Sequence, residues 1–201
     1  MFETFVRAAA ATPSDSILDV GVTSDQTYHH SNYLESWYPH KAMITAVGID
    51  DATFLEGLYS GLRFIRADGR DLPFDDNSFD HVHSGAVLEH VGSRAQQVLF
   101  LKKLWRVTRR TLFVTTPNRG FPVEFHTVLP LVHWLPPDAF RAFLRKTGRA
   151  FFADEQNLNL MTRGDLARSA REAGIAGANV GSVSLLGWPS NLLLRARKPS
   201  G

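Results

Sequence analysis

Three aspartates stand at the ends of three short apolar runs in the first third of the chain. Asp19 lies near the end of the first run, Asp50 directly follows the second, and Asp68 directly follows the third. A single acid after a strand is most often a turn or capping residue, but three at successive strand ends are harder to explain that way. Carboxylates accept hydrogen bonds and attract positive charge, so a shared site would favour a donor-rich, cationic ligand.

The elements that position these acids are short apolar runs bounded by turn residues, which is typical of strands buried on both faces. They predict strands over residues 16–21, 43–49, 63–67, 79–84 and 111–116. Helical spacing and capping signals predict helices over residues 2–11, about 30–37, 93–108, 137–146 and 162–173. Strands that alternate with helices favour a parallel sheet with right-handed crossovers, in which ligands bind beyond the carboxyl ends of the strands.

The end of the chain predicts two further strands, over residues 180–186 and 192–197. The five residues between them are too few for a parallel crossover, so this pair is antiparallel. We therefore predict an α/β, Rossmann-like fold: a seven-stranded, mostly parallel sheet with helices on both faces and a C-terminal antiparallel strand pair. No repeat or linker divides the sequence, which predicts a single domain over residues 1–201.

Composition excludes several classes of protein. The chain has 201 residues, 44% of them apolar and 21% charged, which is ordinary for a folded domain. It has no cysteine, which excludes disulfide scaffolds, thiolate metal sites and cysteine catalysis. The basic residues are spread out and the net charge is only +2, so we expect no nucleic-acid partner. No apolar run approaches the ~20 residues of a membrane span, and the first residues lack a secretory signal, so we expect a cytoplasmic protein.

Five segments resemble the ordered motifs of the class I S-adenosylmethionine-dependent methyltransferases, specifically the small-molecule group that includes enzymes of ubiquinone and menaquinone biosynthesis. They are Asp19-Val20-Gly21, Val47-Gly48-Ile49-Asp50, Ala67-Asp68-Gly69, residues 72–80, and Val87-Leu88-Glu89-His90-Val91. The resemblance is strong over residues 15–118, and the last two segments are its most specific part.

The resemblance implies S-adenosylmethionine as cofactor and assigns roles to the strand-end residues. Asp50 would accept hydrogen bonds from the ribose hydroxyls and Asp68 from the adenine amine. The other candidate cofactor-binding residues are Asp19, Gly21, Thr23, Asp51, Gly69 and Ser84. Gly21 allows the main chain to approach the ligand closely because it has no Cβ.

One loop departs from the family pattern, since Thr23 and Asp25 replace two glycines that usually follow Gly21. A pyrophosphate needs the glycine loop and would be repelled by Asp25, which disfavours a dinucleotide. S-adenosylmethionine has no phosphate. Two interpretations stay open: a reshaped loop that still binds the cofactor, or a protein that has lost affinity for it.

Methyl transfer is an in-line displacement that depends mainly on positioning, although a nearby base helps a hydroxyl acceptor. His90 and His126 follow the fourth and fifth strands and are the candidate catalytic residues; packing roles are the alternative for both. The eight histidines show no spacing typical of a metal site, so we predict none.

Residues 119–137 follow the fifth expected strand, and we predict that they form an acceptor-side insertion. This stretch is rich in large apolar residues: Phe121, Val123, Phe125, Val128, Leu129, Leu131, Val132, Trp134 and Leu135. They could wall an apolar acceptor pocket, form a dimer or membrane-surface contact, or pack in the core.

The sequence thus favours a methyltransferase that uses S-adenosylmethionine to methylate a small-molecule acceptor at oxygen, nitrogen or carbon. A homodimer is one option for its assembly. The alternative is a non-catalytic protein that keeps the fold as a binding module or as the partner subunit of another methyltransferase. An RNA or protein methyltransferase is disfavoured, because no added recognition domain or basic face is present.

Overall fold

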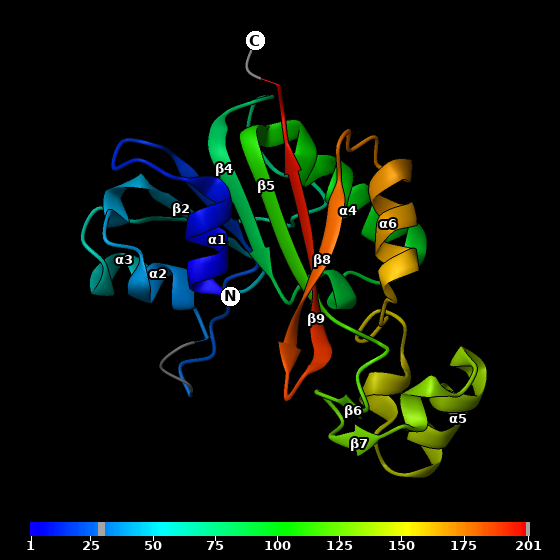
Figure 1. The fold of residues 1–201 in the computed structure, drawn as a ribbon. Coiled ribbons are helices and arrows are strands. Elements are labelled where there is room, and N and C mark those ends of the chain that lie inside the picture. Colours follow the sequence, from blue (N-terminus) through cyan, green and yellow to red (C-terminus); the bar gives the residue numbers. More distant parts are fainter. Residues whose placement is uncertain (28–30, 200–201) are drawn as a thin grey trace.

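The computed structural model describes residues 1–27 and 31–199, and Figure 1 shows its fold. Within this part of the chain, seven strands form one sheet in the order β3-β2-β1-β4-β5-β9-β8. The strands are β1 (Ile17–Val20), β2 (Ile44–Gly48), β3 (Arg63–Arg66), β4 (Phe79–Gly85), β5 (Thr108–Pro117), β8 (Asn179–Leu185) and β9 (Trp188–Arg197). A separate antiparallel pair consists of β6 (Val123–Glu124) and β7 (Leu129–Pro130).

The pairing confirms the predicted fold class. β1 pairs in parallel with both β2 and β4, β3 pairs in parallel with β2, and β5 pairs in parallel with β4. β9 runs antiparallel to both β5 and β8, as the short connection requires. The chain moves outward from β1 through β3 and then returns to the other side of β1, so the strand order switches between β1 and β4.

Helices cover both faces of the sheet. The α-helices are α1 (Phe2–Ala9), α2 (Tyr33–Trp37), α3 (Phe54–Leu58), α4 (Arg94–Val107), α5 (Pro137–Lys146) and α6 (Arg163–Glu172), and the 3₁₀ turns are η1 (Lys41–Met43), η2 (Leu88–His90), η3 (Val132–Trp134) and η4 (Ala150–Ala153). The sequence did not predict α3, which is only five residues long. Residue 30, where the second helix was expected to begin, lies outside the described residues. No helix among the described residues is both long and apolar enough to cross a membrane.

Two apolar cores lie on opposite faces of the sheet. One packs α4 and α6 against the sheet and includes Leu18, Val82, Leu104, Leu112 and Leu166. The other packs α1, α2 and α3 against it and includes Phe5, Ile17, Leu34, Leu55 and Phe113. Strands covered on both faces explain why the sequence shows continuous apolar runs rather than alternation.

The segment between β5 and α6 lies apart from the sheet, at the lower right of Figure 1. Its α5 and η4 enclose a small apolar cluster of their own: Phe140, Leu144, Ala153 and Leu158. Most of the apolar stretch that precedes α5 is exposed, namely Val123, Phe125, Val128, Leu131, Trp134 and Leu135. Core packing therefore does not account for this stretch, which is a surface feature.

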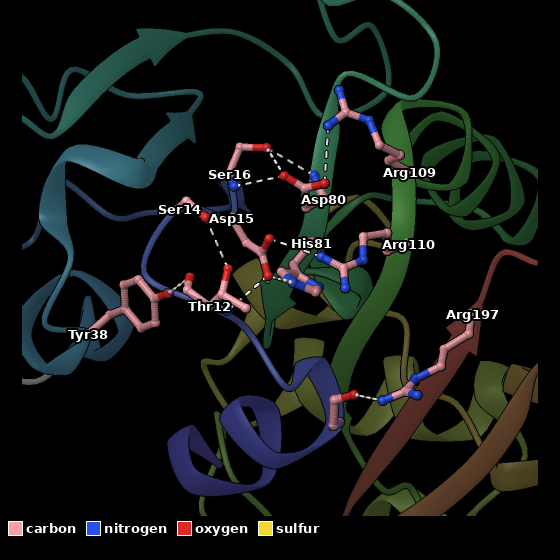
Figure 2. A network of polar contacts seen from close by, with 11 residues as sticks. Thr12, Ser14, Asp15, Ser16, Tyr38, Asp80, His81, Arg109, Arg110 and Arg197 are labelled. Atoms are coloured by element: carbon pink, nitrogen blue, oxygen red, sulfur yellow. Dashed lines mark hydrogen bonds and ion pairs between the residues drawn. The ribbon is translucent and has the colours of Figure 1, made fainter. Parts of the chain in front are cut away.

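Ion pairs and hydrogen bonds join the amino ends of β1, β4 and β5, as Figure 2 shows. Asp80 accepts hydrogen bonds from the backbone N–H and the hydroxyl of Ser16, and it pairs with Arg109 at 3.1 Å. Asp15 pairs with Arg110 at 2.9 Å and with His81 at 3.2 Å. This edge of the sheet is thus held together by polar contacts between its own strands.

A buried polar cluster connects β1 and β4 to α2. His83 donates from Nδ1 to Asp19 at 2.7 Å, and the Tyr33 hydroxyl donates to its Nε2, also at 2.7 Å. Burial raises the pKa of Tyr33, which keeps the phenol protonated. Glu35 is fully buried nearby. Its burial, together with the negative charge of Asp19, raises the pKa of Glu35 well above its ordinary value.

This cluster predicts a pH-dependent stability. The folded protein holds the Glu35 proton to higher pH than the unfolded chain does. The contribution of this protonated group to the free energy of unfolding is therefore complete below the ordinary glutamate pKa, about 4.3, and is lost as the pH rises. We expect Glu35→Gln to remove this dependence on pH. The free energy of unfolding of the variant, relative to that of wild type, should then rise steadily from pH 4 to pH 8. Urea denaturation across this range measures it, with Glu3→Gln on the exposed surface as control. Parallel curves for wild type and Glu35→Gln would contradict the assignment.

Candidate functional site

A cavity of about 290 Å³ opens at the carboxyl ends of β1, β2 and β3. Its lining includes six of the residues singled out from the sequence: Gly21, Thr23, Asp50, Asp68, Gly69 and His90. Apolar wall residues include Ile49, Val87, Val91 and Phe100. The strand switch point between β1 and β4 forms part of this cavity, which is where an open α/β sheet binds its ligands.

The two aspartates on the cavity wall differ in their environments. Asp50 follows β2 and is exposed. Asp68 is partly buried and is held by Arg70, whose Nη2 donates to it at 2.6 Å and whose Nε donates at 3.0 Å. These bonds lower the pKa of Asp68. A ligand amine at Asp68 must therefore share this carboxylate with Arg70, a residue that sequence reasoning did not single out.

Gly21 permits a close approach of backbone to side chain at the cavity. Its φ is +110°, and its N–H donates to the Val47 carbonyl at 2.7 Å. A Cβ at this position would lie 2.0 Å from Cγ2 of Val87. The sequence predicted a close approach to a ligand; in the structure the neighbour that requires glycine is Val87, on the loop that follows β4.

The loop that follows Gly21, in which Thr23 and Asp25 replace two glycines, is held by hydrogen bonds from side chains. Asn32 accepts from the Thr23 N–H at 2.9 Å and donates to the Thr23 carbonyl at 3.0 Å. The Thr23 hydroxyl accepts from the N–H of Asp25, which is exposed. The loop is thus ordered by hydrogen bonds and still contributes Thr23 to the cavity wall.

Three other candidate cofactor residues lie outside the cavity lining. Asp19 is buried against His83, and the Ser84 hydroxyl donates to the Val20 carbonyl at 2.7 Å. Asp51 accepts from the N–H of Thr53 at 3.0 Å and also from its hydroxyl. Successive side chains of a strand point to opposite faces, so proximity to a strand end does not decide where a side chain points.

The two candidate catalytic histidines meet. Nε2 of His90 lies 3.0 Å from Nε2 of His126. Nδ1 of His90 lies 2.6 Å from the Asn157 carbonyl, and Nδ1 of His126 lies 2.7 Å from Glu124. His126 does not line the cavity at the carboxyl ends of β1, β2 and β3, but it contacts His90, which does.

Two buried glutamates that sequence reasoning missed accompany this histidine pair. Burial opposes ionisation of Glu124, but hydrogen bonds from His126 and Thr127 outweigh it and lower the pKa of Glu124 to about 2. Burial likewise lowers the pKa of His126, but the Glu124 carboxylate more than compensates and raises it. Glu89 is fully buried, and burial raises its pKa.

A second cavity, of about 240 Å³, lies beside α4, α5 and α6. Arg94, Arg119 and Arg141 are among its lining residues, which include none of the candidate cofactor-binding or catalytic residues but do include Arg119, His133 and Pro137 of the segment over residues 119–137. The site inferred from the strand ends is therefore the first cavity.

The contact at Gly21 generates a stability prediction. Gly21→Ala forces a Cβ against Val87 and strains a positive φ, which by itself costs about 1–3 kcal/mol. In a Val87→Ala background the clash with Cγ2 disappears, so the same substitution should cost only the backbone strain. Urea denaturation of the four proteins in this double-mutant cycle measures the coupling. An equal cost of Gly21→Ala in both backgrounds would show that Val87 is not the constraint.

Comparisons with known proteins agree with this geometry. Residues 18–112 match the family model described as a methyltransferase domain. This range contains β1 except for Ile17, all of β2 to β4, and all of the residues that line the first cavity. No curated protein matches the sequence.

Solved structures share the fold along nearly the whole chain. A putative methyltransferase from Bacillus halodurans is 15% identical, with a TM-score of 0.63 and 99% coverage of each chain. The 1,6-didemethyltoxoflavin-N1-methyltransferase of Burkholderia thailandensis, solved with 1,6-didemethyltoxoflavin and S-adenosylhomocysteine, is 14% identical, with a TM-score of 0.64 over 98% of this chain and 76% of that one. A putative methyltransferase of Haloferax volcanii in complex with the Trm112 activator is 15% identical, with a TM-score of 0.60 over 100% and 92%.

The family match and the shared fold are two separate observations. The matched segment carries Asp50 and Asp68, the two strand-end acids that line the cavity. Residues 18–112 match a methyltransferase domain, and the chain has the fold of solved S-adenosylmethionine-dependent methyltransferases.

Proposed function

We propose that the cavity beside Asp50 and Asp68 binds S-adenosylmethionine and that the protein methylates a small-molecule acceptor there. The observation that carries the proposal is the presence of two carboxylates on the wall of one cavity at the strand switch point. The cofactor offers ribose hydroxyls, an adenine amine and an α-ammonium group as donors, and a sulfonium cation. Carboxylate acceptors without an anion-binding glycine loop fit this set of groups.

Different lining residues contact different groups of the cofactor. Asp50 is exposed to the cavity and accepts from the ribose hydroxyls. Asp68, shared with Arg70, accepts from the adenine amine, while the backbone of Gly69 and Ala67 borders the base. Thr23, fixed by Asn32, lies on the methionine side. In this proposal Asp19, Asp51 and Ser84 act indirectly, because they hold the strand ends and loops in place.

The acceptor side is formed by the histidine pair and by the segment over residues 119–137. His90 lines the cavity, and His126 extends the site toward this segment. We place the whole chain, residues 1–201, in one methyltransferase domain in which this segment is an acceptor-side insertion. Its exposed apolar side chains suit an acceptor that is small and partly apolar. The Burkholderia neighbour was solved with bound 1,6-didemethyltoxoflavin, which supports a small-molecule acceptor by analogy.

The chemistry requires little of the protein beyond position. The bound cofactor supplies an electrophilic methyl group on sulfur. The walls at Ile49, Val87 and Val91 exclude water from it, and the histidine pair controls the proton of the acceptor. Because the Asn157 carbonyl can only accept from Nδ1 of His90, Nε2 is the nitrogen that can accept a proton when this ring is neutral.

A second candidate function is that of a partner subunit. The exposed apolar surface over Phe125, Val128 and Leu131 favours it, and the Haloferax neighbour was solved with an activator protein. This function would be supported if the purified protein binds the cofactor but transfers a methyl group only when it is in a stable complex with another protein. Size-exclusion chromatography with light scattering would at the same time test the possible homodimer.

The aspartate at the end of β2 provides the direct test. We expect Asp50→Ala to weaken binding of S-adenosylhomocysteine by about 10- to 100-fold, since it removes hydrogen bonds to a charged group of about 1.5–3 kcal/mol. Isothermal titration calorimetry measures the affinity. Asp51→Ala is the matched control, because this neighbouring acid bonds to Thr53 and lies outside the cavity lining. Equal affinities of the two variants, or no binding by wild type at millimolar ligand, would refute the proposed site.

A further inference from the structure

Three side chains of the kinds that bind metal ions converge at the acceptor side of the cavity. Glu89 and His90 come from η2, directly after β4, and His126 comes from the segment after β6. One ligand atom of each lies within 4.8 Å of the others. Residues 36 positions apart in the chain thus form one compact group of two imidazoles and a carboxylate.

The hydrogen bonds of the two histidines determine which nitrogens carry protons. The Asn157 carbonyl can only accept, and the Glu124 carboxylate, which also accepts from the backbone N–H groups of His126 and Thr127, is an acceptor too. Each imidazole therefore carries its proton on Nδ1 when neutral. Both Nε2 atoms then present lone pairs to each other across 3.0 Å. Two lone pairs at this distance repel unless a proton or a metal ion lies between or beside them.

Glu89 supplies the negative charge that such a cation needs. Its side chain is fully buried, and Oε2 accepts from the Thr116 hydroxyl at 2.9 Å. The other oxygen, Oε1, has no hydrogen-bond partner among the described residues and lies 3.9 Å from Nε2 of His90. A buried carboxylate oxygen without a partner is costly, and this one faces the histidine pair.

We propose that Glu89, His90 and His126 form a binding site for a divalent transition-metal ion such as Zn²⁺ or Fe²⁺. Two imidazoles with one carboxylate are a known ligand set for both ions. Ligand atoms at ~2.1 Å from one ion lie roughly 3.0–3.4 Å apart. The two Nε2 atoms are 3.0 Å apart, and Oε1 of Glu89 lies 3.9 Å from Nε2 of His90, so the carboxylate must move closer to complete the site.

The surroundings of the three ligands also fit a metal site. Metal-bound histidines usually donate their second N–H to a carboxylate or a backbone carbonyl, which orients the ring. His126 has Glu124 in this role and His90 has the carbonyl of Asn157. Thr116 orients the carboxylate of Glu89. Three protein ligands leave at least one coordination position for another molecule.

This position gives the ion a role, which rests on the proposed function. His90 belongs to the wall of the cofactor cavity, so an ion bound to it lies beside the place where the acceptor must bind. A hydroxyl or thiol that coordinates a divalent metal ion has a lower pKa and releases its proton to solvent more readily. The site would therefore select acceptors with a metal-binding oxygen or sulfur atom.

Metal binding can be tested without any methyl-transfer assay. Full-length protein without a polyhistidine tag is treated with a chelator, dialysed, and titrated with Zn²⁺ by calorimetry and with Co²⁺ by absorption spectroscopy. We expect one ion per chain and a d–d spectrum of four- or five-coordinate Co²⁺. His126→Ala and Glu89→Gln should each weaken Zn²⁺ binding by about 100-fold or more. His40→Ala, at an exposed histidine outside the group, should bind as wild type does.

Circular dichroism and thermal melts establish that each variant is folded; if His126→Ala is not, His90→Ala serves in its place. The proposal is overturned if wild type binds no Zn²⁺ at stoichiometric concentration, which would leave a proton shared between the two imidazoles. It is also overturned if the folded ligand variants bind as wild type does. Binding of S-adenosylhomocysteine, measured on the same samples, separates this failure from that of the proposed function.

Discussion

Parallel pairing of β1 with both of its neighbours is the constraint on which the site depends. Hydrogen bonds to β2 on one side and β4 on the other bring the carboxyl ends of three strands to the same edge of the sheet. The loops that leave these ends diverge at the switch point, and the cavity forms between them. At the opposite edge, ion pairs such as Asp80–Arg109 and Asp15–Arg110 join the strands to one another (Figure 2).

The same constraint separates acids that look alike in the sequence. Asp50 leaves the sheet after β2 and reaches the cavity, whereas Asp19 still belongs to β1 and turns toward His83 on β4. Asp68 reaches the cavity but arrives already paired with Arg70. On the acceptor side, the loop after β4 carries Glu89 and His90 to His126. Backbone geometry thus decides which ionisable groups reach the cavity and which contact the strands.

Much of the fold could be predicted from the sequence because strands buried on both faces leave continuous apolar runs, and because a short connection forces antiparallel pairing at β8 and β9. The five-residue α3 is too short to show a helical period. The direction of Asp19 and the pairing of Arg70 with Asp68 depend on side-chain orientation, which spacing does not encode. The contact between His90 and His126 is a tertiary contact between distant segments, so no local sequence motif predicts it. Exposure of Leu131 and Trp134 likewise follows from where the segment between β5 and α5 lies, not from its hydrophobicity.

The carboxyl ends of β1, β2 and β3 are the proposed binding site for the cofactor, and a crystal structure of the protein with S-adenosylhomocysteine would examine this site atom by atom. We expect the ribose hydroxyls within hydrogen-bond distance of the Asp50 carboxylate and the adenine beside Asp68, with the thioether sulfur directed toward His90. A ligand bound instead in the cavity of Arg94, Arg119 and Arg141, or an adenosine away from both aspartates, would contradict it.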